Sequence, residues 1–217
     1  MSINKTYAVI GLGKYGRAVA EELVKSGAEV LAIDFNEEYV NDASATIPVC
    51  KCADITDPKV IEQLGISEVD VVIVAMATSL EASVMAITLC KEAGVQTVIA
   101  KCSDEMQKKI MSRVGADIVV FPEKESGIRL AKNLLSAGFI DMISLSKDIS
   151  VVELDVRSEW AGKSLIELDL RKNYDINVVA IRSGDEVAVR IDPRAPLTEE
   201  QKLIVIAHTA SLNQLNK

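Results

Sequence analysis

The chain has 217 residues, of which 49% are hydrophobic and only 4% aromatic, so its core must rely on Ala, Val, Ile and Leu. Such a composition suits helices packed on a parallel sheet. Lys and Arg total 24 against 32 Asp and Glu, and this net charge of −8 repels phosphate backbones and anionic lipid, so we expect no nucleic-acid partner.

Nothing in the opening residues or in the apolar runs predicts export or membrane insertion. The N-terminus runs straight into a glycine motif, without the apolar segment and cleavage site of a signal peptide. The longest unbroken apolar run, Val71 to Ala77, is far shorter than the ~20 residues that a membrane span needs. We therefore expect a cytoplasmic protein.

Six short apolar runs alternate with stretches of helical spacing through residues 1–137. The runs lie at 7–10, 29–33, 47–50, 71–75, 97–100 and 117–121. Four of the intervening stretches end in a glycine just before the next run, which is typical of a helix closed by a left-handed residue; these are Gly27, Gly65, Gly94 and Gly115. This alternation predicts an α/β fold with a Rossmann-like, doubly wound parallel sheet.

The pattern changes near Gly138. Residues 142–217 read as a short helix at 164–174, a hairpin turning at 183–185, and a further strand at 202–208. We expect a second domain there, a small α+β C-terminal lobe. A helix at about 122–136, with a broad apolar face, ends the first domain and joins it to the lobe.

Gly11, Gly13 and Gly16 have the G-x-G-x-x-G spacing, between an apolar run and an Ala-rich helical stretch. In this motif the first glycine allows a tight turn, the second lets the backbone approach a phosphate, and the third lets the helix pack close to the strand. The phosphate then lies at a helix N-terminus, where free N–H groups and the helix dipole favour an anion. The motif predicts a nucleotide site.

Asp34 ends the next apolar run, where its carboxylate can accept hydrogen bonds from both ribose hydroxyls. A 2′-phosphate would be repelled there, so NADP is disfavoured. The residues alone do not distinguish ATP, ADP and NAD, which share an adenosine ribose and a phosphate chain. Lys14, inside the loop, is either an ordinary solvated lysine or a cation for a terminal phosphate.

Catalysis of hydride transfer is the weaker interpretation of this motif. A dehydrogenase needs a proton donor beside the cofactor. The one histidine, His208, ends a predicted strand of the small lobe, and no Tyr-x-x-x-Lys pair occurs. A nucleotide sensor without turnover fits these residues better.

Five segments together resemble the RCK (TrkA-N/TrkA-C) regulatory subunits of bacterial potassium uptake systems, of the KtrA/KtrC type. They read YAVIGLGKYG, LAIDFN, VDVVIVAMATSLEAS, VGADIVVFPEKESG and LDLRKNYDINVVAIRSGDEV, and they cover nearly the whole chain in order. The resemblance implies a gating ring and not an enzyme. Homodimers would assemble into an octameric ring beneath a membrane-embedded potassium transporter, at the inner face of the cell membrane, with ATP favouring the conducting state and ADP the resting state.

An NAD(H)-binding regulator of the TrkA type is the alternative function, and a small NAD-dependent oxidoreductase is a more distant one. Carried over by position, the resemblance implies a ligand-binding set, with Asp34 on the ribose and Asp54 and Ile55 flanking the base. The full set is Gly11, Gly13, Lys14, Tyr15, Gly16, Asp34, Asn36, Asp54, Ile55, Met76, Ala77, Lys101 and Glu123.

Two of these positions carry the implied switch. Lys14 stands where the family usually has an arginine that reaches the terminal phosphate of a neighbouring subunit's nucleotide. Glu123 matches a glutamate that helps bind a divalent cation, Mg²⁺ or Ca²⁺, at the dimer interface. The other interpretation of Glu123 is an acid that favours a helix start.

The C-terminal lobe of some relatives binds cyclic di-AMP at its dimer interface. Arg171, Asn177 and Val178 lie in the matching stretch, although hairpin packing and surface charge explain them equally well. The resemblance also implies that the helix at 122–136 crosses to a partner and makes the dimer. The alternative is that this helix only covers its own sheet.

Overall fold

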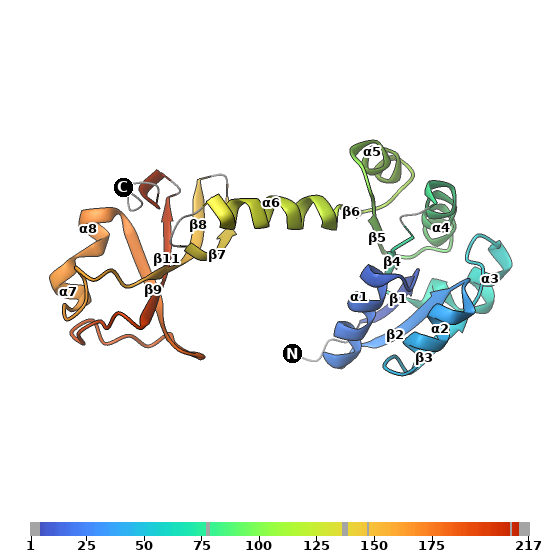
Figure 1. The fold of residues 1–217 in the computed structure, drawn as a ribbon. Coiled ribbons are helices and arrows are strands. Elements are labelled where there is room, and N and C mark those ends of the chain that lie inside the picture. The colour runs from blue at the N-terminus through green and yellow to red at the C-terminus, as the bar shows by residue number, and fades with distance from the viewer. Residues whose placement is uncertain (1–4, 77–78, 136–138, 147, 209, 213–217) are drawn as a thin grey trace. The chain divides into compact units, whose positions relative to one another are not determined.

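A computed structural model describes residues 5–76, 79–135, 139–146, 148–208 and 210–212 (Figure 1). The chain forms two compact units, Met1–Lys124 and Glu125–Lys217. Each unit has its own sheet and its own hydrophobic core.

The first unit contains a parallel sheet of six strands. They are β1 (Thr6–Ile10), β2 (Glu29–Asp34), β3 (Val49–Cys52), β4 (Val71–Val74), β5 (Thr97–Lys101) and β6 (Ile118–Val120). Their order is β3-β2-β1-β4-β5-β6, so the chain winds outward in one direction from β1 and then in the other from β4. The predicted doubly wound fold is thereby confirmed.

Both faces of this sheet are covered, which explains why its strands read as apolar runs. Ala8 and Ile10 belong to one core cluster and Val9 to the other, because successive side chains of a strand point to opposite faces. Helices α1 (Lys14–Lys25) and α2 (Glu37–Ala43) pack on the Val9 side. Helices α3 (Pro58–Gln63), α4 (Leu80–Glu92) and α5 (Glu105–Arg113) pack on the other.

Among helices α1 to α5 of the first unit, all but one begin at a capping side chain. The side chains of Asn36, Asp57, Ser79 and Asp104 cap the N-termini of α2 to α5. The four predicted closing glycines all have positive φ. Helix α1 is the exception, since it begins after Gly13 with no side-chain cap and no acidic residue in its first turn. A helix N-terminus without a side-chain cap favours an anion.

The second unit contains an antiparallel sheet of order β10-β9-β11-β8-β7. Its elements are β7 (Phe139–Ser144), β8 (Ile149–Asp155), α7 (Leu165–Leu168), α8 (Leu170–Tyr174), β9 (Ile176–Ser183), β10 (Glu186–Ala188) and β11 (Gln201–His208). The hairpin between β9 and β10 turns where the sequence predicts it. Trp160 and the inward side chains of β8 and β11 form the core together with residues of α7, α8 and β9. This arrangement confirms the small α+β lobe.

Helix α6 (Pro122–Leu135) begins in the first unit and continues in the second. Its Ile128, Leu130 and Leu134 are 48%, 60% and 77% exposed. These exposed apolar side chains agree with a helix that packs on a partner, although dimerisation itself stays a prediction. No helix within the described residues is both long and apolar enough to cross a membrane.

Gly16 provides the first test of this fold. A Cβ at Gly16 would lie 1.9 Å from the carbonyl oxygen of Gly11, so we expect Gly16→Ala to lower the free energy of unfolding by about 2 kcal/mol or more. Gly13→Ala is the matched control, because its Cβ would meet nothing within 4 Å, and it should cost less than about 1 kcal/mol. Urea denaturation measures both, and equal losses would contradict this account of the loop.

Candidate functional site

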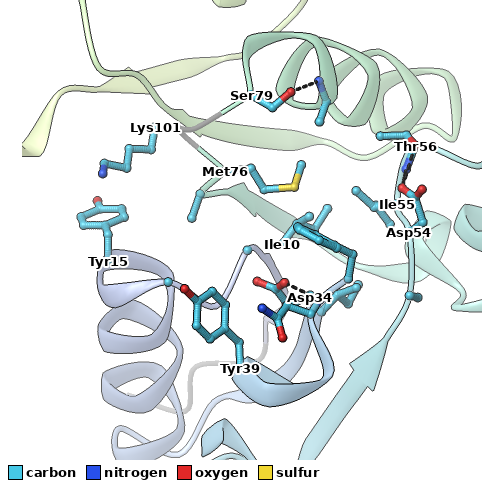
Figure 2. Close-up of a pocket in the computed structure, with 18 of the residues that line it drawn as sticks. Ile10, Tyr15, Asp34, Tyr39, Asp54, Ile55, Thr56, Met76, Ser79 and Lys101 are labelled. Carbon is cyan, nitrogen blue, oxygen red and sulfur yellow. Dashed lines mark hydrogen bonds between the residues drawn. The ribbon is translucent and has the colours of Figure 1, made fainter. Parts of the chain in front are cut away.

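A cleft of about 520 Å³ lies at the carboxyl ends of the parallel strands (Figure 2). Strands β1 and β4 are neighbours, but the chain leaves them toward opposite edges of the sheet, so a crevice opens between the loops that follow them. The cleft is lined by Ile10, Gly11, Gly13, Lys14, Tyr15, Ile33, Asp34, Phe35, Asn36, Tyr39, Ala53, Asp54, Ile55, Thr56, Ala75, Met76, Ser79, Ala82, Lys101 and Glu123.

The three glycines of the loop have different surroundings. Gly11 has φ +95°, and a Cβ there would lie 2.9 Å from Met76 Cγ. Gly16 packs beneath the loop, against the Gly11 carbonyl, and does not line the cleft. At Gly13 a Cβ would meet no atom within 4 Å, so no contact within the described chain explains a glycine there. The open space beside Gly13 belongs to the cleft.

Asp34 is only 6% exposed, and its two carboxylate oxygens accept backbone hydrogen bonds. Oδ2 accepts from the N–H of Leu12 at 2.6 Å, and Oδ1 from the N–H of Asn36 at 2.9 Å. The carboxylate thus ties the end of β2 to the loop after β1. Each oxygen retains acceptor capacity for a further donor, such as a ribose hydroxyl.

Asp54 and Thr56 lie at one end of the cleft (Figure 2). Asp54 Oδ1 accepts from the backbone N–H of Thr56 at 3.0 Å and from its hydroxyl at 2.7 Å. These hydrogen bonds hold the pKa of Asp54 below its ordinary value, so this carboxylate stays ionised at neutral pH. Ile55 beside it is buried and supplies an apolar wall.

Lys101 and Tyr15 lie at the opposite end, beside the start of α1 (Figure 2). The Lys101 ammonium is 2.6 Å from Glu123 Oε1 and 5.6 Å from the centroid of the Tyr15 ring. Its hydrogen bond lowers the pKa of the Glu123 carboxyl. Together with the uncapped N-terminus of α1 and exposed Lys14, this ammonium makes the end a place for an anion.

The described residues of one chain do not form a divalent-cation site by themselves. No group of three or more His, Cys, Asp or Glu among them could hold a metal ion. Glu123, the predicted ligand, is paired with Lys101. The cation prediction therefore depends on ligands from a second subunit.

The other predicted site residues are Ala77 and three residues of the second unit. Ala77 is outside the described residues. In the second unit, Arg171 and Asn177 are exposed on α8 and β9, and Val178 packs partly against the core. The single histidine, His208, is exposed at the end of β11 and belongs to the second unit.

Sequence reasoning missed about half of the cleft wall. The missed residues are Ile10, Ile33, Phe35, Tyr39, Ala53, Thr56, Ala75, Ser79 and Ala82. Three of them, Ile10, Ile33 and Ala75, end a predicted apolar run, and that position was a usable signal. Tyr39 had no such signal, since it reaches the cleft from within α2.

Comparison with known proteins finds a matching domain family for each part of the chain. Residues 7–122 match the TrkA-N domain and residues 149–217 match the TrkA-C domain. The chain is 36% identical to Ktr system potassium uptake protein C of Bacillus subtilis (strain 168), over 99% of this chain and 97% of that protein. It is 33% identical to Ktr system potassium uptake protein A of Vibrio alginolyticus, over 94% and 92%.

Among solved structures, the GsuK channel bound to NAD superposes with a TM-score of 0.64 at 15% identity. That match covers 99% of this chain but only 39% of the channel chain, and it shows a shared fold. The two matched domains define the class, an N-terminal TrkA-N domain followed by a TrkA-C lobe. The chain belongs to the RCK family of regulatory subunits of bacterial potassium uptake systems, of the KtrA/KtrC type.

The carboxylates of Asp34 and Asp54, which both line the cleft, give a matched test. Asp34→Ala would leave the N–H of Leu12 buried without its acceptor, and we expect a loss of about 1–3 kcal/mol in unfolding free energy. Asp54→Ala removes an exposed turn contact and should cost less than about 1 kcal/mol. Chemical denaturation compares them, and similar losses would show that Asp34 does not anchor the loop.

Proposed function

We propose that the protein is a nucleotide-sensing, gating-ring subunit of a potassium uptake transporter and that it binds ATP or ADP in the cleft. The observation that carries this proposal is the exposed backbone of Gly13 at the wall of the cleft. No protein contact requires glycine there, whereas a phosphate approaching the loop would. The uncapped N-terminus of α1 supplies N–H donors at the same place.

The rest of the cleft suits the adenosine half of such a ligand. Its volume of about 520 Å³ lies within the range of roughly 300–1,000 Å³ that is usual for small-molecule sites. Asp34 would accept hydrogen bonds from the ribose hydroxyls and would repel a 2′-phosphate. Asp54 and Ile55 would flank the base.

NAD(H) is the second candidate ligand. A channel with the same fold has been solved bound to NAD, and NAD shares the adenosine ribose and the phosphates with ADP. The cleft would accept this dinucleotide through the same Asp34 and Gly13 contacts. Binding of NAD(H) in place of ATP or ADP would make the protein a regulator of the TrkA type.

The proposed switch depends on the terminal phosphate. In a homodimer, and in an octameric ring built from dimers, Lys14 of one subunit would reach the terminal phosphate held by its neighbour. A lysine keeps the charge of the usual arginine but loses its two-pronged hydrogen bonding. ATP and ADP would then favour different arrangements of the subunits, because only ATP makes this contact.

The remaining assignments follow the same model. The partner is a membrane-embedded potassium transporter, and the protein would act at the inner face of the cell membrane. Glu123 would bind a divalent cation only with ligands from a second subunit. Arg171, Asn177 and Val178 would contact cyclic di-AMP between two C-terminal lobes. No catalytic role is proposed, since His208 lies outside the unit that holds the cleft.

Gly13→Ala tests the cleft as a nucleotide site. The added methyl group would occupy the space of the approaching phosphate, so we expect the affinity for ADP to fall at least about tenfold. Isothermal titration of ATP, ADP, NADH and NAD against wild type and variant measures this loss and also ranks the ligands. Unchanged affinity in a folded variant would contradict the proposal.

Lys14→Ala tests the switch. We expect the preference for ATP over ADP to fall about tenfold, because one charged hydrogen bond to the terminal phosphate is lost. Lys25→Ala, at the other end of α1 and 80% exposed, is the control for the change in net charge. A preference that survives Lys14→Ala would remove Lys14 from the mechanism.

A further inference from the structure

The Lys101–Glu123 ion pair places a carboxylate of the protein at the anion-binding end of the cleft. Lys14 and Lys101 are the lysines that line the cleft, and Asp34, Asp54 and Glu123 are its carboxylates. Asp34 is engaged by backbone N–H groups and Asp54 by Thr56. Glu123 differs from both, because its partner is the Lys101 ammonium.

The two partners of this ion pair are unequally free to move. The Lys101 side chain is 13% exposed and is held over the Tyr15 ring, whereas Glu123 is 60% exposed. A carboxylate at the surface regains its hydration when it turns outward, so breaking the pair from its side costs little. A lysine that left this place would have to abandon both the carboxylate and the ring.

We propose that, when no divalent cation is bound, Glu123 is a specificity-determining residue that competes with the ligand's phosphates for the Lys101 ammonium. This inference rests on the proposed nucleotide site. In the absence of ligand the carboxylate occupies Lys101. A ligand with enough phosphate charge displaces the carboxylate into solvent and takes its place, because phosphate carries more charge than a single carboxylate and offers more acceptor oxygens.

Because of this competition, the effect of Glu123 on affinity depends on whether the ligand carries phosphate. Adenosine has no phosphate to present to Lys101, so it cannot gain from the removal of Glu123 in the way that ADP can. The carboxylate therefore lowers the affinity for ADP more than the affinity for adenosine. The effect is opposite in sign to that of a cation ligand, whose loss would weaken nucleotide binding.

The same part of the fold supplies a matched control. Lys124, the residue after Glu123, pairs with Glu105 at the start of α5. Glu105 also stands in the first turn of a helix, its pKa is also lowered by a lysine, and it does not line the cleft. Glu105→Gln therefore removes the same charge and the same kind of ion pair as Glu123→Gln.

The test is titration calorimetry of the full chain with ADP and with adenosine, in EDTA and at low salt. In E123Q we expect the ratio of ADP to adenosine affinity to rise about threefold, which corresponds to one partly exposed ion pair. In E105Q the ratio should stay at the wild-type value. In K101Q/E123Q the rise should disappear, because the Lys101 ammonium, for which the Glu123 carboxylate and the ADP phosphates compete, is absent.

An unchanged or lower ratio in E123Q would overturn the inference, as would an equal rise in E105Q, which would indicate a general charge effect. A rise that persists in K101Q/E123Q would show that Lys101 is not the contested group. Wild-type protein that binds neither ligand would overturn the proposed function itself, and this inference with it.

Discussion

The contact of Gly16 with the carbonyl oxygen of Gly11 is the constraint on which the cleft depends. It lets the first turn of α1 lie against the end of β1, where even a methyl group would collide with the backbone. The N-terminus of α1 is therefore held at the carboxyl edge of the sheet. Asp34 fastens the other side of the same loop through the N–H of Leu12. Two contacts with the backbone of the loop, one from Gly16 and one from the Asp34 carboxylate, thus shape the floor of the cleft.

The fold could be predicted because strands buried on both faces leave an unmistakable mark in the sequence. Strand β4, buried at every position, was the clearest case. Strand β3 was the poorest, since the apolar run at 47–50 lies two residues ahead of the observed Val49–Cys52. As an edge strand it is largely exposed, with Val49 at 47%, so pairing with β2 and not burial determines its extent.

The sequence indicated about half of the residues that line the cleft, and it indicated none of their contacts. The glycine motif and the family resemblance indicated most of the charged and glycine positions that line the cleft. Neither could show that Lys101 and Glu123 pair with each other, because that contact depends on how β5 and the start of α6 meet. The structural role of Asp34 was hidden for the same reason, since backbone N–H groups carry no sequence signature. Motifs name the groups in a site, and packing decides which of them are already engaged.

The cleft presents a physical contradiction, since it would bind an anion although carboxylates outnumber lysines along its wall. The contradiction disappears once each carboxylate is assigned its partner. Asp34 accepts hydrogen bonds from backbone N–H groups and Asp54 accepts them from Thr56, whereas Glu123 is the carboxylate of the cleft wall that is paired with a lysine of that wall. Glu123 is the second residue of α6, which continues into the second unit, so a phosphate that displaced Glu123 from Lys101 would change a contact at the start of that helix. The charge of the ligand and the first turn of α6 would then be linked through the Lys101 ammonium, and the sheet would not need to rearrange.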